Sequence, residues 1–353
     1  MVTQELPYVL TFYIWSVTFS FIGLGLTSFF FKKSTDLGYG VSRVLGMLVV
    51  SYIGWFGSSV LKIPYTNYII LAVLMVGMAV SMFLLRRQNI NWYGIKRNFP
   101  VIVIEEIIFI TAYAAMIAYR GANPRIEGIE KFMDYAILNG LYRSESLPPQ
   151  DVWFSGYTIN YYYFGHFILN IFNKLTQIPR EISYNLQVSN LFAMSVLATF
   201  SVILNLISRG EKFTHIKQFP KGFFAFMGAM ILTIGGNLDY MYQMVYEKKA
   251  DYFYADARSL IPFTINEFPA YSFLISDLHA HILDIPFVLL LIFFSIYIWN
   301  NRNEKMDNKT VIFYGLALGS LSAINSWDFF VYSAFVSLIL FCIVFSHKFS
   351  KEI

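Results

Sequence analysis

The sequence has one cysteine and few charged residues, and both shortages narrow the class of protein. Cys342 lies in an apolar run, so no disulfide, cysteine-ligated zinc site or iron–sulfur cluster can form within this chain. Charged residues make up only 14% of the 353 positions and hydrophobic residues make up 57%, whereas soluble domains carry roughly 25% charged residues. This composition indicates a membrane protein. The net charge of +4 is too small and too dispersed to indicate a nucleic-acid partner.

Long apolar runs are abundant, and each crossing of a bilayer takes about 20 apolar residues as a helix. Nine stretches qualify: 8–31, 44–61, 67–85, 101–119, 184–207, 222–238, 283–299, 311–325 and 329–346. The first lacks a basic leader and a small-residue cleavage site, so we interpret it as a retained helix. The sequence therefore predicts an all-α fold, a polytopic transmembrane helix bundle of about nine spans.

Basic residues collect after alternate spans, in segments 32–43, 86–97, 209–221, 302–309 and 348–351. Cytoplasmic loops carry an excess of Lys and Arg. We therefore expect an integral protein of the cell membrane with its N-terminus outside and its C-terminus in the cytoplasm.

Segment 159–177 would reverse this orientation if it were a tenth crossing. It also contains Asn160, His166, Asn170 and Asn173, which are costly in hydrocarbon. We expect it to be an amphipathic helix at the outer interface.

This topology leaves two long outer loops, roughly 120–183 and 239–282, and divides the chain into a three-span segment, 1–99, and a membrane core, 100–353. Loops this long are usually functional or disordered, and the aromatic, Pro and Gly residues here favour order. In the first loop, 132–142 is expected to form a short helix that ends before Pro148-Pro149.

A candidate metal site lies at the end of the second loop, in Asp277, His279 and His281. In an extended segment the three side chains face one way and suit a divalent cation or a phosphate. In a helix Asp277, His281 and Asp284 share a stripe and His279 points elsewhere. The remaining interpretation is a hydrogen-bonded cap on the following span.

Other polar residues also have two interpretations. Tyr161, Tyr162 and Tyr163 fit either a membrane-interface anchor or a binding surface, and Arg120 and Arg125 either cap spans or clamp a phosphate. Glu105 and Glu106 lie inside a span, where they either bond neighbouring helices or line a proton or ion pathway. Asp134, taken alone, fits a solvated position on a surface helix. Further candidates for substrate binding are Asp151, His166, Asn237, Asp239, Glu267 and Asp328.

An ordered set of motifs resembles the "YYY" family of uncharacterised archaeal and bacterial polytopic membrane proteins. The motifs are IEKFMDYAILNGLYRSESLPPQDVWFSGYTINYYYFGHFILNIFNKLTQIPREISYNL, GNLD at 236–239, EFPAYSFLISDLHAHILDIPF at 267–287 and GLALGSLSAINSWDF at 315–329. The resemblance covers about 100–347 and departs from the family pattern at Phe132 and Val152. Members are often longer, so it also allows for a second membrane chain as a partner of a split protein.

The family in turn resembles GT-C-type glycosyltransferases, which take sugars from polyprenyl-phosphate carriers at the outer face of the membrane. This resemblance implies a GT-C-like core in which Asp134, with Glu130 one turn earlier, is the catalytic carboxylate of the first loop and serves as base or metal contact. It implies a polyprenyl-phosphate-linked sugar and membrane lipids as partners. The departing phosphate then needs a cation, either a divalent metal (Mg²⁺ or Mn²⁺ ahead of Zn²⁺) on Asp277, His279 and His281 or an arginine. The chain has no phosphate-binding GxxxxGK[ST] loop, in line with the absence of a nucleotide cofactor.

Two rival functions remain open from the sequence. A transporter or lipid flippase would place Glu105, Glu106, Asp239 and Asp328 along a pathway. A non-catalytic subunit of a split membrane enzyme would need none of these residues for chemistry. Transporters place their sites near mid-depth, whereas most polar residues here fall toward one side.

Overall fold

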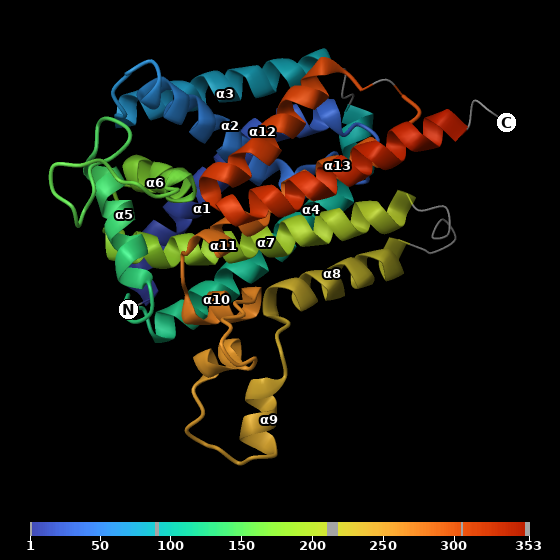
Figure 1. The fold of residues 1–353 in the computed structure, drawn as a ribbon. Helices are drawn as coiled ribbons and strands as arrows, with labels where there is room; N and C mark the ends of the chain where they lie inside the picture. The colour runs from blue at the N-terminus through green and yellow to red at the C-terminus, as the bar shows by residue number, and fades with distance from the viewer. Residues whose placement is uncertain (1, 89–91, 210–217, 305, 350–353) are drawn as a thin grey trace.

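Residues 2–88, 92–209, 218–304 and 306–349 are described by a computed structural model, and this part of the chain is helical (Figure 1). The elements are α1 (Val2–Phe30), α2 (Tyr39–Ser59), α3 (Asn67–Arg87), α4 (Trp92–Ala122), α5 (Lys131–Arg143), α6 (Phe164–Thr176), α7 (Arg180–Arg209), α8 (Gln218–Ile234), α9 (Asp239–Val245), the 3₁₀ helix η2 (Tyr254–Ser259), α10 (Pro269–Ile275), α11 (Ala280–Asn300), α12 (Asn308–Ile324) and α13 (Ser326–Phe349). The prediction of an all-α helix bundle is confirmed.

Seven of the described helices are long and apolar enough to cross a membrane, and an eighth crossing would need the bent pair α8 and α9. The two parts of that pair meet at 75°, directly after Gly235-Gly236. Helix α12 has 17 residues and so is about 26 Å long, which is shorter than a bilayer core of about 30 Å. Seven of the nine expected spans thus correspond to such helices in the described residues, and the other two stretches, 222–238 and 311–325, form the 17-residue helices α8 and α12.

The orientation stays a prediction. Parts of the basic segments that support it, 89–91, 210–217, 305 and 350–353, lie outside the described residues.

Helices α1 and α2 approach closely because each carries glycine at the contact. A Cβ atom on Gly23 would lie 1.8 Å from the Ser42 carbonyl oxygen, and one on Gly46 would lie 2.0 Å from the Phe19 carbonyl oxygen. Small residues at such crossings let backbones pack directly, as is usual between membrane helices. The pair forms one wall of the core.

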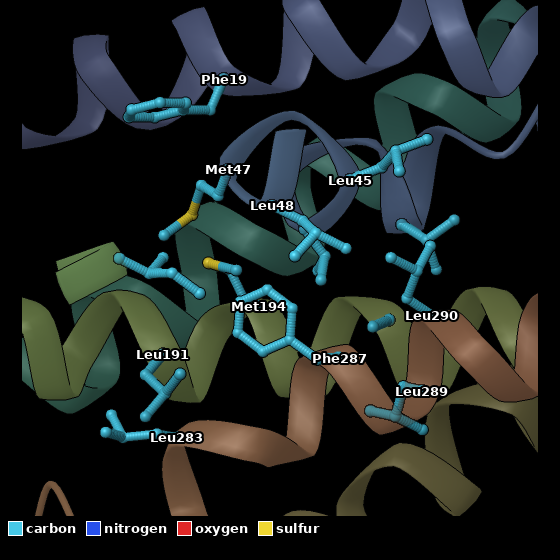
Figure 2. Packing of buried hydrophobic residues seen from close by; sticks show 14 of the residues in the cluster. Phe19, Leu45, Met47, Leu48, Leu191, Met194, Leu283, Phe287, Leu289 and Leu290 are labelled. Carbon is cyan, nitrogen blue, oxygen red and sulfur yellow. The ribbon is translucent and has the colours of Figure 1, made fainter. Parts of the chain in front are cut away.

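The apolar core joins the N-terminal helices to the rest of the chain. Met47 and Leu48 of α2 face Met194 of α7 and Phe287 of α11 (Figure 2). Buried residues of α1, α2, α7 and α11 belong to one continuous cluster. The residues of 1–99 therefore share their packing with those of 100–353.

Helix α6 differs from the interfacial helix that was expected. It has 13 residues, too few to span a membrane, and Phe164 through Lys174 are all buried. Its polar residues are satisfied inside the protein: Asn173 Oδ1 accepts hydrogen bonds from Ser183 Oγ (2.6 Å) and Gln187 Nε2 (2.9 Å). The helix is therefore buried within the bundle, because these bonds replace contacts with water or headgroups.

The two long loops meet beside the ends of α4 and α7. Tyr119 donates a hydrogen bond to the Leu274 carbonyl oxygen (2.7 Å), which ties the start of the first loop to α10 in the second. The expected short helix of the first loop is present as α5, and α9 projects away from the bundle (Figure 1). This meeting of the loops positions the candidate site.

Candidate functional site

The buried face of α5 carries Asp134 into the protein interior. Asp134, Ile137, Leu138 and Leu141 recur at helical spacing and are all buried. Asp134 lies in the first helical turn, where the helix dipole favours a negative charge. A carboxylate on an otherwise apolar face requires polar partners.

His166 is the first of those partners. It lies in the first turn of α6, and its Nε2 is 2.9 Å from Asp134 Oδ1. Neither side chain has exposed surface. A hydrogen bond to an ionised group is roughly twice as strong as one between neutral groups, so this contact fixes the Asp134 carboxylate.

His279 is the second partner, and it arrives from the second loop. Helix α10 ends at Ser276, which has a left-handed φ of 62°, and Asp277, Leu278 and His279 precede the start of α11. His279 Nδ1 lies 3.0 Å from Glu130 Oε2 and 3.8 Å from Asp134 Oδ1. The segment thus combines both predicted conformations, extended up to His279 and helical from Ala280.

The pKa values of Asp134, His279 and Asp277 are shifted in different directions by burial and by the charges of their neighbours. Burial by itself raises the pKa of Asp134, but the contacts with His166 and His279 outweigh burial and hold the pKa well below its usual range. Burial also lowers the pKa of His279, and the carboxylates of Asp134 and Glu130 outweigh it and raise the pKa to about 9. For Asp277, burial and the nearby charge of Asp134 together raise the pKa to about 8.

We call Glu130, Asp134, His166, Asp277 and His279 the Asp134 cluster. At neutral pH it combines a hydrogen-bond acceptor, a hydrogen-bond donor and a positive charge. Asp134 is ionised, Asp277 carries a proton and His279 is positively charged. Asp134 Oδ2 and Asp277 Oδ1 are buried and accept no hydrogen bond from an N–H or hydroxyl group of the described residues, while the carboxyl groups of Asp134 and Asp277 lie within hydrogen-bonding reach of each other. His279 is 21% exposed and Glu130 54% exposed, so the cluster is open to an incoming molecule on that side.

His281 faces a neighbouring set of polar groups. Its Nε2 lies 2.6 Å from Ser272 Oγ, and its Nδ1 lies 3.4 Å from Glu267 Oε2, which in turn pairs with Arg258. Within the described ranges, no group of three or more His, Cys, Asp or Glu side chains has the geometry to hold a metal ion. Metal binding by Asp277, His279 and His281 stays a prediction.

The three predicted tyrosines separate in the structure. Tyr161 interacts electrostatically with Asp134 and Glu130, and burial followed by its contact with Tyr162 raises its pKa. The rings of Tyr161 and Tyr162 lie 4.0 Å apart. Tyr163 instead accepts a hydrogen bond from Trp55 Nε1 (3.1 Å) on α2. Tyr161 therefore borders the Asp134 cluster and Tyr163 borders the apolar bundle.

The two predicted arginines lie outside the Asp134 cluster. Arg120 is buried, and its guanidinium donates to Asn185 Oδ1 (2.8 Å) and to the Arg125 carbonyl oxygen (3.1 Å). Arg125 pairs with Glu127 on the surface at 3.3 Å. These contacts occupy donors that a phosphate would otherwise use.

The other predicted residues make local contacts. Asp151 accepts from the backbone of Trp153 and Phe154, Asn237 donates to the Ala257 carbonyl, Asp239 contacts Gln243 and Tyr252, Glu267 pairs with Arg258, and Asp328 accepts from Asn325. Glu267 also lies 3.4 Å from His281 Nδ1 and Asp328 interacts with Asp284 on α11, whereas the other contacts stay within one turn or loop.

Sequence reasoning gave no role to Lys131 and placed Asp284 only on the helical stripe that it would share with Asp277 and His281. Lys131 is 9% exposed and interacts with Arg120 and Asp277. A lysine in the first turn of a helix is unfavourable because its charge opposes the helix dipole. This unusual position was the feature of the sequence that could have singled out Lys131. Asp284 is fully buried on α11, faces Asp328 and receives no hydrogen bond from the described residues. Its position one turn after His281 was the corresponding signal.

Comparison with known proteins gives one match. A family model described as "Uncharacterized membrane protein (DUF2298)" matches residues 49–352. No curated protein and no solved structure matches the chain.

Proposed function

The chain belongs to this family of membrane proteins, and we propose that it transfers a sugar from a polyprenyl-phosphate donor to an acceptor hydroxyl at the outer face of the cell membrane. The observation that carries the proposal is the buried, ionised Asp134, whose carboxyl group His166 and His279 hold in its charged form beside Asp277. It lies among groups that supply a donor and a positive charge. Sugar transfer from a phosphate carrier uses all three.

Asp134 is the proposed proton acceptor. The acceptor hydroxyl donates its hydrogen bond to Asp134 Oδ2 while its oxygen attacks the anomeric carbon of the sugar. Because the pKa of Asp134 is low, proton transfer occurs late, when the new C–O bond has made the hydroxyl acidic. His166 is a positioning residue in this scheme, since its bond to Oδ1 directs Oδ2 at the substrate.

The departing group is the polyprenyl phosphate, which leaves with the electron pair of its bond to the sugar. His279, positively charged below a pKa of about 9, stabilises the developing negative charge. Asp277, protonated below about pH 8, donates a hydrogen bond to the same oxygens. A divalent cation at Asp277, His279 and His281 remains part of the proposal as an alternative source of positive charge.

The lipid tail has a candidate path beside α6. An apolar groove of about 340 Å³ lies between α2, α6 and α12 and is lined by Tyr52, Trp55, Phe164 and Gly319, among others. Phe164 precedes His166 by two residues, so the same end of α6 borders the groove and contacts Asp134. A tail in the groove would leave its phosphate near Tyr163 and the Asp134 cluster.

The test is mass spectrometry of glycoconjugates and polyprenyl-phosphate sugars in cells that lack the gene. We expect an acceptor without its sugar and an accumulated lipid-linked sugar, both reversed by the wild-type chain but not by Asp134→Asn at equal membrane abundance. Glu127→Gln, an exposed carboxylate on the same loop, is the matched control and should restore both. Full restoration by Asp134→Asn would contradict the proposal, and ion-dependent uptake into proteoliposomes would favour a transporter.

A further inference from the structure

A second group of buried polar side chains lies at the opposite end of α7 from the Asp134 cluster. Asp36 follows α1, Glu105 lies on α4, and Ser201 and Asn205 lie on α7; all four are buried. Asn205 is twenty residues beyond Asn185, which contacts the first loop, so the two ends lie about 30 Å apart along the helix. The proposed sugar transfer uses none of these residues.

Protein donors surround the carboxyl group of Asp36. Its Oδ1 accepts hydrogen bonds from the Gly38 amide and from Asn205 Nδ2, each at 3.0 Å. Its Oδ2 accepts from Ser201 Oγ and, at 3.5 Å, from the Gly40 amide. Both carboxyl oxygens of Asp36 are therefore occupied by hydrogen bonds.

Glu105 has the opposite environment. It has no exposed surface, and neither carboxyl oxygen receives a hydrogen bond from the described residues. Glu105 Oε1 lies close to Gly40 and Ser201, both of which donate hydrogen bonds to Asp36. A Cβ atom on Gly40 would lie 3.2 Å from Glu105 Oε1 and 2.8 Å from Ser201 Oγ. An ionised carboxyl without donors is very costly in an apolar interior.

The charges around Glu105 do not compensate for a second anion. Three charged side chains interact with Glu105: Asp36 from the segment after α1, Arg43 from α2, and Glu106 from α4 itself. Arg43 Nη2 lies 2.7 Å from both oxygens of Glu106, so its charge is already paired.

The remaining neighbours of this group are neutral. Tyr13 of α1 and Tyr39 of α2 donate to Glu106, and α7 contributes Ser201 and Asn205. Three ionised carboxyls and one guanidinium would therefore leave two negative charges in excess within the bundle. Two adjacent carboxyls of this kind share a proton in preference to ionising together.

We propose that Glu105 and Asp36 form an intramembrane proton-binding site, in which Glu105 holds one exchangeable proton that it donates to the Asp36 carboxylate. Release of the proton leaves two carboxylates facing each other and sends the proton to water at this end of the bundle. Their repulsion would move α4 away from the segment between α1 and α2. The site is independent of the sugar-transfer proposal.

Infrared spectroscopy of the full-length protein in proteoliposomes tests the site, because a protonated carboxyl has a carbonyl stretch that a carboxylate lacks. We expect protonated-carboxyl absorption at neutral pH from both Glu105 and Asp277. The Glu105 band shifts in D₂O, disappears in Glu105→Gln and persists in Glu127→Gln and Asp277→Asn. An unchanged band in Glu105→Gln would overturn the proposal. So would loss of the wild-type band on adding Na⁺ at constant pH, since the site would then bind sodium.

Labelling the wild-type chain keeps the test decisive if Glu105→Gln does not fold. Glutamate carrying ¹³C in its side-chain carboxyl should shift the Glu105 band, while labelled aspartate should leave that band in place and shift only the absorption of Asp277. The reverse result would assign the proton to Asp36 or another aspartate and overturn the proposal.

Discussion

The Asp134 cluster and the Asp36–Glu105 site both bury carboxyl groups, but they differ in what surrounds them. The first is built from loops and short helices, contains two histidines and is open through His279, which is 21% exposed. The second lies between long helices, and its two carboxyl residues are fully buried. A buried carboxylate that a substrate can reach suits chemistry, whereas an enclosed one suits storage of a charge or a proton. The following substitutions test whether the Asp134 cluster serves chemistry and the Asp36–Glu105 site holds a proton.

The largest expected effect is on sugar transfer in Asp134→Asn. Loss of the proton acceptor should lower the rate about 10²- to 10⁴-fold, while the amide retains the shape of the side chain and the protein stays folded. The rate of transfer in isolated membranes, normalised to the amount of protein, is the measurement. A rate within twofold of wild type would remove Asp134 from the mechanism and end the contrast between the two regions.

The next largest effect is a difference in the free energy of unfolding between Glu106→Gln and Glu105→Gln. Glu106→Gln leaves Arg43, which is 1% exposed, without a charged partner, and breaking a buried ion pair costs on the order of 3 kcal/mol. Glu105→Gln replaces a neutral acid by a neutral amide and should change stability by less than about 1 kcal/mol. Chemical unfolding in detergent gives both values. Equal losses would show that Glu105 is ionised.

His166 should have a smaller effect on catalysis than Asp134, because it acts through Asp134. His166→Leu removes a hydrogen bond to a charged group, worth about 1.5–3 kcal/mol, so kcat should fall about ten- to hundredfold with KM little changed. The pKa of Asp134 should rise, which moves the acid side of the pH profile to higher pH.

His166→Gln is the control for that measurement, since it retains an N–H donor and should recover part of the rate. An unshifted pH profile in His166→Leu would mean that His166 serves packing alone.

A further effect concerns Asp277 and the dependence of stability on pH. Its pKa in the folded protein, about 8, lies above its unfolded value of about 4, so the folded state binds the proton more tightly. The stability linked to this group is therefore complete below about pH 4 and decreases as the pH rises toward 8. Asp277→Asn should flatten the decrease in thermal stability over this range.

Transfer by the wild-type enzyme should also decline above about pH 8, as Asp277 loses its proton, and above about pH 9, as His279 loses its charge. A rate that is constant from pH 7 to pH 10 would contradict the roles given to both residues.

Local sequence patterns predicted some elements well. The proline pair at 148–149 marked the end of α5, and apolar length predicted most spans. The pattern failed where tertiary contacts decide. Helix α6 is buried because Asn173 bonds to Ser183 and Gln187, and the chain bends by 75° after α8, which ends at Ile234, four residues before the expected end of its span. Hydropathy does not show which helix ends will bend or stop.

The candidate site shows the same limit. Asp134, His166 and His279 were each singled out by residue type and position, but their contact joins residues more than 100 positions apart and depends on the fold. Asp36 gave no signal, because it follows two lysines in a short loop and its partners Ser201 and Asn205 lie more than 160 residues away. Neutral partners at that separation leave no pattern in a single sequence.

Turnover of lipid-linked sugars by the purified chain tests the central claim most directly. Proteoliposomes containing polyprenyl-phosphate-linked sugars and hydroxyl acceptors would be incubated with wild-type protein or Asp134→Asn, and released polyprenyl phosphate would be measured. The account predicts release matched by glycosylated acceptor with wild-type protein, and neither product with Asp134→Asn. Equal release with both proteins would contradict it.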